Sequence, residues 1–138
     1  MSGFILDRRL EAETILAVSL PLCDVLLRDD ARTLWVIAVP RRAGLEEVHD
    51  LGAEDQAQLM IEIARISKAV AQIAQPTKVN TGMLGNIVRQ LHVHVVARTE
   101  GDFAWPGPVW GVGERVVMEA DARANMLTQV QAALSEAG

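Results

Sequence analysis

The chain has 138 residues, 50% of them hydrophobic and 22% charged, a composition sufficient for one folded domain with a sizeable core. Its 13 Lys and Arg residues against 18 Asp and Glu residues give a formal net charge of −5, which disfavours general binding to nucleic acids. The single cysteine excludes an intramolecular disulfide. No apolar run approaches the ~18 residues of a membrane span, and the charges at residues 7–9 argue against a signal peptide. We therefore expect a cytoplasmic protein that does not bind membranes.

The first third of the chain predicts a short helix and a hairpin. Apolar residues at helical spacing favour a helix over residues 7–17. Residues 23–28 and 33–39 are short apolar runs, and the polar segment 29–32 between them is typical of a turn. The two runs are expected to pair as antiparallel strands.

The rest of the chain predicts two helices and two further strands. Apolar residues recur at steps of three and four between residue 52 and Pro76, which indicates an amphipathic helix. The other expected elements are strands at 78–84 and 87–98, an ordered loop at 99–113 and a C-terminal helix at 114–137. Together they predict an α+β fold, in which an antiparallel sheet of about five strands is joined by a long packed helix and a C-terminal helix.

Two of the three histidines lie close together in the most strongly predicted strand. Because strand side chains alternate between faces, we expect Gln90, His92 and His94 to project from one face. Their spacing fits ordinary half-exposed polar residues, a metal site built on His-x-His, or catalysis and anion binding. The metal interpretation lacks an obvious further ligand, because His49 lies among acids and is expected on a solvated surface.

The residues before this strand are suited to phosphate. Gly85 and Asn86 supply a flexible backbone and an amide side chain. Amide N–H groups and neutral imidazoles donate hydrogen bonds to phosphate oxygens without a basic surface. A small phosphate site is therefore compatible with an acidic chain.

Residues 85–96, Gly-Asn-Ile-Val-Arg-Gln-Leu-His-Val-His-Val-Val, resemble the signature of the histidine triad (HIT) superfamily. That signature is His-φ-His-φ-His-φ-φ, where φ is apolar; here every φ position is apolar, and the second and third histidines are His92 and His94. The order of hairpin, long helix and motif strand is also that of the family. The resemblance implies one HIT-like domain over residues 1–138, with a motif-bearing core at about 22–98 and a C-terminal extension at 99–138.

The resemblance implies a role for each matched residue. The middle histidine of the family's motif attacks the α-phosphorus of a nucleotide and forms a nucleotidyl-histidine intermediate, and that position is His92. The attack needs a neutral imidazole with one free nitrogen, the other being held by an acceptor such as a backbone carbonyl. By the same match, His94 donates a hydrogen bond to the phosphate, and Asn86 replaces the family's phosphate-contacting Gln.

Three residues depart from the family's pattern. Gln90 replaces the first motif histidine and cannot titrate, Ile87 replaces a Ser or Thr near the α-phosphate, and Trp35 stands where a histidine often begins the second strand. That first position mainly supports the site, so we expect activity to survive, weakened or shifted in substrate. The same departures favour the alternative, a nucleotide-binding or interaction protein with little catalytic turnover.

Two further polar residues match the family's nucleotide contacts. An acid or amide at the end of the first hairpin strand contacts the ribose in the family, which points to Asp29. Asn80 resembles the Asn of an Asn-x-Gly element that precedes the motif. A solvated hairpin tip and a strand end explain these two residues equally well. Trp105 and Trp110 are expected in core or subunit packing, or one of them closes over the nucleotide.

The implied function is that of a hydrolase or transferase acting at the α-phosphate of a nucleotide conjugate. Nucleoside phosphoramidates and dinucleoside polyphosphates are the family's substrate types. No metal is required for the covalent step, although some members use Mg²⁺ with polyphosphate substrates. The resemblance is also the basis for expecting a homodimer.

Overall fold

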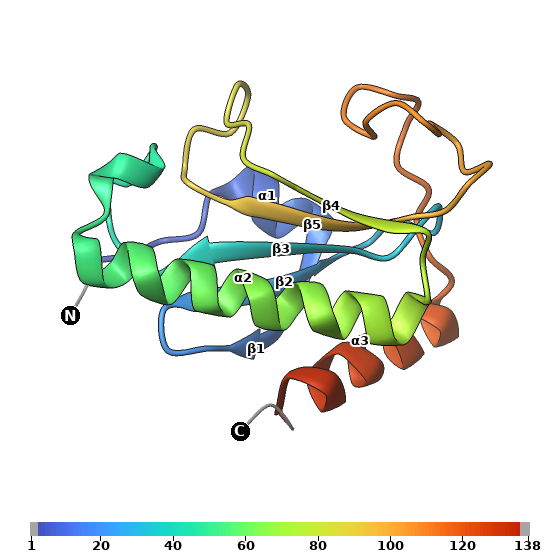
Figure 1. Ribbon diagram of the computed structural model, residues 1–138, viewed down its shortest axis with the longest axis horizontal. Helices are drawn as coiled ribbons and strands as arrows, with labels where there is room; N and C mark the ends of the chain where they lie inside the picture. Colours follow the sequence, from blue (N-terminus) through green and yellow to red (C-terminus); the bar gives the residue numbers. More distant parts are fainter. Residues whose placement is uncertain (1–2, 136–138) are drawn as a thin grey trace.

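The computed structural model describes residues 3–135 (Figure 1). Its elements are α1 (Arg8–Glu13), β1 (Thr14–Ser19), β2 (Cys23–Arg28), β3 (Trp35–Pro40), the 3₁₀ helix η1 (Val48–Asp50), α2 (Ala53–Ala74), β4 (Lys78–Gly82), β5 (Val93–Arg98) and α3 (Ala120–Ser135). The strands form one antiparallel sheet in the order β1-β2-β3-β5-β4. The predicted α+β fold is confirmed, including the hairpin of β2 and β3 and the long helix α2.

The N-terminal segment differs from the prediction of a helix over residues 7–17. Helix α1 ends at Glu13, and the next six residues form β1, which pairs with β2 from Thr14 opposite Arg28 to Ser19 opposite Asp24. Thr, Ile and Val side chains suit an extended backbone better than a helix interior. Pairing with β2 also satisfies backbone groups of β1, so a non-local contact overrides the helical spacing.

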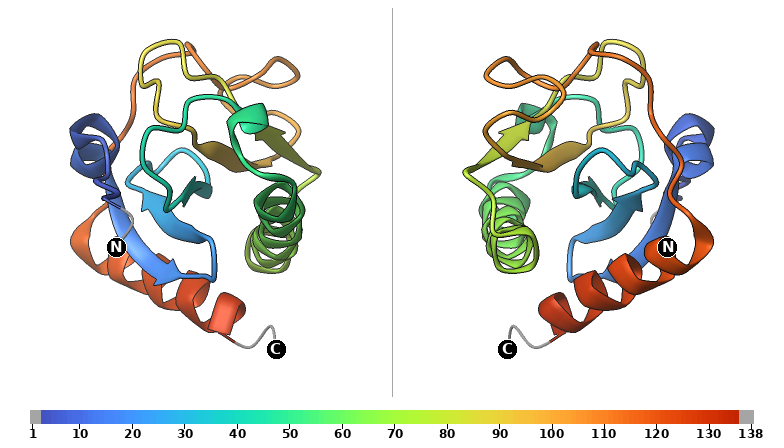
Figure 2. Two further views of the ribbon diagram at one scale, coloured as in Figure 1. Left: turned by 90° about the vertical axis from the view of Figure 1, so that its left-hand side faces the viewer. Right: turned by 90° about the vertical axis from the view of Figure 1, so that its right-hand side faces the viewer.

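The two faces of the sheet are covered by different elements. Helices α2 and α3 pack on one face, over a core that includes Val25, Val36 and Val95. The loops 83–92 and 99–113 rise on the opposite side (Figures 1 and 2). The core on that side consists of Leu10, Leu26, Trp35, Ile37, Val39, Val96 and Val109. Since strand residues alternate between faces, His94 shares the second face with Val96.

A buried acid joins α2 to the turn between β1 and β2. Glu62 is fully buried, and its carboxylate oxygens accept hydrogen bonds from the backbone N–H groups of Leu22 and Cys23, both at 2.8 Å. These charge-assisted bonds offset the cost of burying the carboxylate. Cys23 is buried as expected, and burial together with Glu62 raises the pKa of its thiol.

The C-terminal helix begins later than predicted. Residues 114–119 run along the hairpin tip, where Ala31 N–H donates to Val116 O at 2.6 Å and Met118 N–H donates to Asp29 Oδ1 at 2.9 Å. Backbone groups used in this way are not available for a first helical turn, so α3 starts at Ala120. The predicted end of the helix at residue 137 lies outside the described residues. Among residues 3–135, no helix has the length and apolar character to cross a bilayer.

Candidate active site

The strand that carries the motif begins later than predicted. Strand β5 starts at Val93, so Gln90 and His92 lie in the loop before it, and the expectation that one strand carries all three polar residues is wrong. The loop turns at Gly85, whose φ is +81°, a conformation that favours glycine. Leu91 N–H then donates to Leu45 O at 2.9 Å. The loop backbone therefore bonds to another loop rather than to a neighbouring strand.

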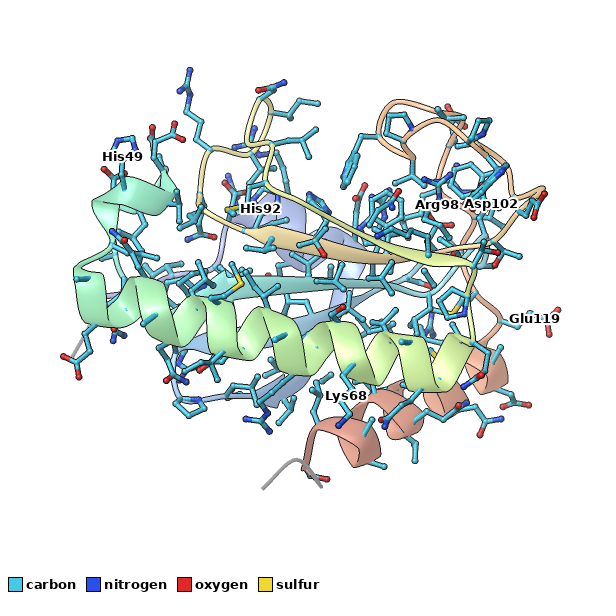
Figure 3. The ribbon with its side chains drawn as sticks, in the orientation of Figure 1. His49, Lys68, His92, Arg98, Asp102 and Glu119 are labelled. Atoms are coloured by element: carbon cyan, nitrogen blue, oxygen red, sulfur yellow. The ribbon has the colours of Figure 1, made fainter. Side chains whose placement is uncertain are left out.

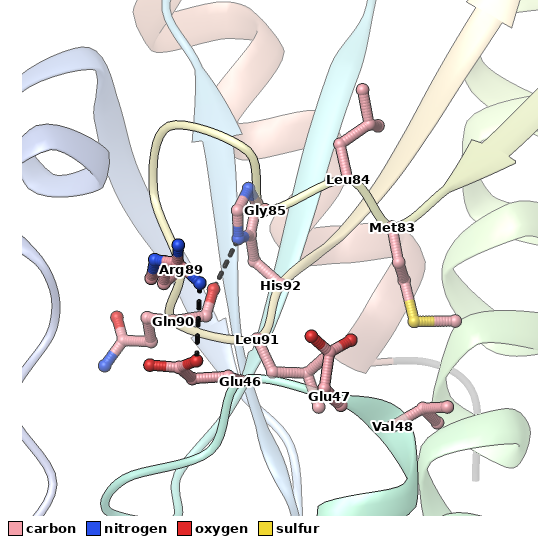
Figure 4. Close-up of a pocket in the computed structure, with 10 residues that line it drawn as sticks. All are labelled: Glu46, Glu47, Val48, Met83, Leu84, Gly85, Arg89, Gln90, Leu91 and His92. Atoms are coloured by element: carbon pink, nitrogen blue, oxygen red, sulfur yellow. Dashed lines mark hydrogen bonds and ion pairs between the residues drawn. The ribbon is translucent and has the colours of Figure 1, made fainter.

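The loop nevertheless brings His92 beside His94. Their ring centroids lie 4.8 Å apart, and both side chains are buried. Nδ1 of His92 lies 2.6 Å from the backbone carbonyl of Gln90 (Figure 4). A carbonyl oxygen can only accept, so Nδ1 carries the ring proton and Nε2 keeps a lone pair. This is the arrangement that a nucleophilic imidazole requires.

His94 has the opposite tautomer. The indole Nε1–H of Trp35 donates to Nδ1 of His94 at 2.9 Å, which places the proton of the neutral ring on Nε2. Burial, followed by the electrostatic effects of the neighbouring His92 and Arg28, lowers the pKa of His94 from an ordinary value of 6.5 to about 3. His94 is therefore a neutral hydrogen-bond donor at physiological pH.

The low pKa of His94 predicts a pH dependence of stability. The unfolded chain takes up a proton at this histidine near pH 6.5, whereas the folded chain does so only near pH 3. Stability from this group is therefore fully present above the unfolded pKa. It is lost as the pH falls towards the folded pKa, at up to about 1.4 kcal/mol per pH unit.

Urea unfolding of the wild type and of His94→Gln between about pH 7 and pH 4.5 tests this, because Gln can still accept the Trp35 bond but cannot titrate. The wild type is expected to lose more of its free energy of unfolding than the variant over this range. The buried carboxylates with lowered pKa, such as Asp102, respond mainly at lower pH. Equal losses in the two proteins would contradict the prediction.

The two histidines line a pocket of ≈ 560 Å³, here called the site pocket. Its charged residues are Arg9, Arg28 and Glu13, so two arginines face one acid. The remaining lining residues are Leu10, Ile37, Leu84, Gly85, Asn86, Ile87, Val88, Trp110 and Gly111. The pocket combines hydrogen-bond donors, an apolar wall and a positive charge balance, which suits an anionic ligand with an apolar part.

Trp110 closes one side of the site pocket. Its ring contacts His94 edge-on at a centroid distance of 5.5 Å and Trp35 at 6.2 Å. Gly82 lies opposite His94 in the pairing of β4 with β5, and a Cβ at this glycine would lie 2.8 Å from the Trp110 ring. The absence of a side chain at Gly82 therefore lets Trp110 approach His94, and its ring both packs against the core of this face and lines the site pocket.

A smaller pocket of ≈ 220 Å³ lies against His92 and shares Gly85 with the site pocket (Figure 4). Its charged residues include Glu46 and Arg89, whose side chains form an ion pair at 3.8 Å. His92 thus separates a pocket with a positive charge balance from one with acidic residues.

The predicted support residue Gln90 contacts His92 through its backbone carbonyl. Its side-chain Oε1 accepts from Asp7 N–H at 2.8 Å, and its Nε2 donates to Ile5 O at 2.9 Å. The side chain therefore ties the N-terminal segment to the loop, whereas the carbonyl orients His92. Asn86 is exposed and lines the site pocket as predicted.

Asp29 and Asn80 are not brought to the histidines. The Asp29 carboxylate accepts from Met118 N–H at 2.9 Å and pairs with Arg123 at 3.1 Å, and the Asn80 side-chain oxygen accepts from Arg98 at 2.7 Å. Neither residue lines the site pocket. Their oxygens are engaged by the C-terminal extension and by Arg98, and the nucleotide contacts expected of Asp29 and Asn80 stay predictions.

From the sequence, we did not predict that Arg28 lines the site pocket or that Trp35 donates a hydrogen bond to His94. The Arg28 guanidinium lies 4.1 Å from the centroid of the Trp35 ring, and burial lowers its pKa. Strand alternation places Arg28 on the same face as Leu26, which was a usable signal. His49, by contrast, lies on η1 with its side chain 80% exposed (Figure 3), as predicted.

The metal interpretation gains no support from the geometry. Among the residues that the structure describes, no group of three or more His, Cys, Asp or Glu side chains is placed to hold a metal ion. Nδ1 of His92 and Nδ1 of His94 are both engaged in hydrogen bonds. The hydrogen bond of His92 leaves its Nε2 free, whereas that of His94 leaves a proton on Nε2, so in this arrangement only one of the two rings offers a lone pair to a metal ion.

Two adjacent imidazoles beside a pocket on an antiparallel sheet fit the histidine triad signature read from residues 85–96. A family model of the HIT domain matches residues 9–101. The chain belongs to the HIT family, so the resemblance read from residues 85–96 is confirmed.

Solved structures support the same assignment. A histidine triad protein of Bradyrhizobium japonicum is 43% identical, with a TM-score of 0.92 over 95% of this chain and 98% of the other. One of Sinorhizobium meliloti 1021 is 42% identical, with a TM-score of 0.93 over 97% and 99%. One of Marinobacter aquaeolei VT8 is 38% identical, with a TM-score of 0.94 over 98% of each chain. A comparison with curated proteins gives no match.

Proposed function

We propose that this protein is a hydrolase or transferase that acts at the α-phosphate of a nucleotide conjugate through a nucleotidyl-histidine at His92. The observation that carries the proposal is the 2.6 Å contact between His92 Nδ1 and the Gln90 carbonyl. It leaves Nε2 unprotonated in a residue that lines the site pocket. Membership of the HIT family supports the same chemistry.

In the proposed first step, the lone pair of His92 Nε2 forms a bond to the α-phosphorus. The bond from phosphorus to the leaving group breaks with its electron pair, and a basic leaving group takes a proton from solvent. The phosphorylated ring keeps its proton on Nδ1, so the Gln90 carbonyl at 2.6 Å faces the positive charge that develops there. Water then attacks phosphorus and loses a proton to solvent, the P–N bond breaks with its electron pair returning to Nε2, and the nucleoside monophosphate and free His92 result. If another nucleophile attacks in place of water, the nucleotidyl group is transferred to that acceptor.

The phosphate oxygens are proposed to accept from His94 Nε2–H and from the Asn86 amide. Arg9 and Arg28 supply positive charge in the site pocket. Donors aimed at the oxygens where charge develops lower the barrier more than donors in bulk water do. A local site of this kind agrees with the net charge of −5, because the ligand is one small anion and not a polyanion.

The proposed steps use side chains of this protein alone. Mg²⁺ is therefore an additive to test with polyphosphate substrates rather than a requirement for the covalent step. A homodimer stays a prediction of the family resemblance, and light scattering of the purified protein checks it.

The test is the release of AMP from adenosine 5′-phosphoramidate and from diadenosine tetraphosphate, the latter with and without Mg²⁺. We expect turnover of at least one substrate. Because phosphorus–nitrogen bonds to histidine survive in alkali, an alkaline quench followed by digestion and mass spectrometry is expected to find the adduct on the His92 peptide. Absence of turnover and of adduct, with AMP still raising Tm, would overturn the proposal in favour of a nucleotide-binding protein.

A further inference from the structure

We propose that Trp35 is a positioning residue that holds the His94 ring with its only proton on Nε2, directed to the ligand. The role of that proton toward a phosphate rests on the proposed function. The hydrogen bond that fixes the ring does not, and it can be measured without a substrate.

The contact between the two rings is short and buried. Trp35 is 1% exposed, and its Nε1–H lies 2.9 Å from Nδ1 of His94. Pairing of β3 with β5 places Ile37 opposite His94 and Trp35 opposite Val96, so the two rings are diagonal neighbours on one face of the sheet. An indole N–H can only donate, and Nδ1 of His94 must therefore accept.

This bond excludes two alternative states of His94. A ring turned over about its axis would place a C–H group against the indole and lose the bond. A ring protonated on Nδ1 would place two N–H groups against each other. Nε2 is then the polar atom of the ring that His94 can present to the site pocket, and it presents a proton.

Arg28 reinforces the arrangement from the face of the indole ring. Its guanidinium lies 4.1 Å from the Trp35 ring centroid. A cation over the ring face draws electron density from the indole, which strengthens the N–H group as a donor. The same charge disfavours a second proton on His94. Arg28 over the indole face and His94 at the indole edge thus form one cluster with Trp35 that keeps His94 neutral and oriented.

The test compares the wild type with Trp35→Phe, which keeps an aromatic ring but removes the N–H group. In the ¹⁵N-labelled wild type, nuclear magnetic resonance is expected to detect a ¹⁵N–¹⁵N coupling between Trp35 Nε1 and His94 Nδ1. In Trp35→Phe, the ¹⁵N chemical shift of His94 Nδ1 is expected to move to the value of an unprotonated ring nitrogen that accepts no hydrogen bond. We expect kcat to fall about tenfold with KM nearly unchanged, as for loss of one orienting hydrogen bond.

Trp110→Phe is the matched control for the resonance measurement. Trp110 also packs edge-on against His94, but its buried Nε1–H has no hydrogen-bond partner within residues 3–135. Its replacement is expected to leave the His94 Nδ1 resonance near its wild-type position. A purely structural role of Trp35 would instead give similar resonance changes in both variants.

Absence of the coupling in the wild type, or an unchanged His94 resonance and kcat in Trp35→Phe, would overturn the inference. If Trp35→Phe does not fold, the presence or absence of the Trp35–His94 coupling in the wild type decides whether Trp35 holds the His94 ring. If the wild type has no turnover, the proposed function fails, and the coupling and the Nδ1 resonance still decide whether Trp35 holds His94.

Discussion

Replacing His92 by asparagine is expected to lower kcat at least about 10³-fold and to abolish the covalent adduct. The variant retains a polar side chain in the same loop but has no ring nitrogen with a lone pair to attack phosphorus. The wild-type ring is held by the Gln90 carbonyl at 2.6 Å, so the loss removes an oriented nucleophile. Steady-state AMP release and mass spectrometry of the alkaline-quenched protein measure the two effects.

His94→Gln is the matched comparison for this prediction. Because His94 is proposed to donate a hydrogen bond and to form no bond to phosphorus, its loss is expected to lower kcat about 10²-fold while the adduct still forms. The two variants therefore separate the covalent role from the donor role. An adduct in His92→Asn, or none in His94→Gln with turnover retained, would contradict the assignment.

Replacing Arg98 by alanine is expected to lower the free energy of unfolding by about 3–5 kcal/mol. Arg98 is 1% exposed, and its guanidinium contacts Asp102 at 2.9 and 3.1 Å, Asn80 at 2.7 Å and the Gly107 carbonyl at 2.8 Å. Figure 3 shows Arg98 and Asp102 beside each other. The pair Arg98–Asp102 is almost fully shielded from water. Removing the cation therefore leaves the shielded Asp102 carboxylate with backbone donors but no countercharge, and two further acceptors without this donor.

Urea denaturation measures the change in the free energy of unfolding, and tryptophan fluorescence tests whether the change affects the loop that contains Trp105. The Arg98 guanidinium lies 5.7 Å from the Trp105 ring centroid, so emission is expected to shift as the loop 99–113 loosens. Arg98→Lys is expected to lose less of the free energy of unfolding than Arg98→Ala, since lysine keeps the positive charge but not the several N–H donors of the guanidinium. A double variant with Asp102→Asn is expected to recover part of the loss. A change below about 1 kcal/mol in Arg98→Ala would show that the network is not structural.

Elements with a strong local pattern could be predicted from sequence. The stripe of apolar residues in α2 and the turn residues between β2 and β3 specify those elements by short-range periodicity. Strand β1 could not be predicted in this way, because its structure depends on pairing with β2. The predicted start of β5 is too early for a related reason. Residues 87–92 include enough apolar side chains for a strand, but the backbone N–H of Leu91 donates to Leu45 in another loop instead of to a neighbouring strand.

The candidate site shows the same division. Short motifs identify His92 and His94, because the chemistry requires those residue types at that spacing. The expected roles of Asp29 and Asn80 rested on matching positions alone. In the structure, Arg123 binds Asp29 and Arg98 binds Asn80. Because these partners are not neighbours in the sequence, a local motif does not predict the two contacts.

By itself, the sequence determined the family, the fold class and the two histidines on which the proposed chemistry depends. Only the tertiary structure decided which nitrogen of each ring carries the proton. A tautomer is set by the hydrogen-bond partner, and the partner of His94 is Trp35, 59 residues away in the chain. The acidic composition disfavours a polyanion partner, whereas folding brings His92, His94, Asn86 and two arginines to one pocket.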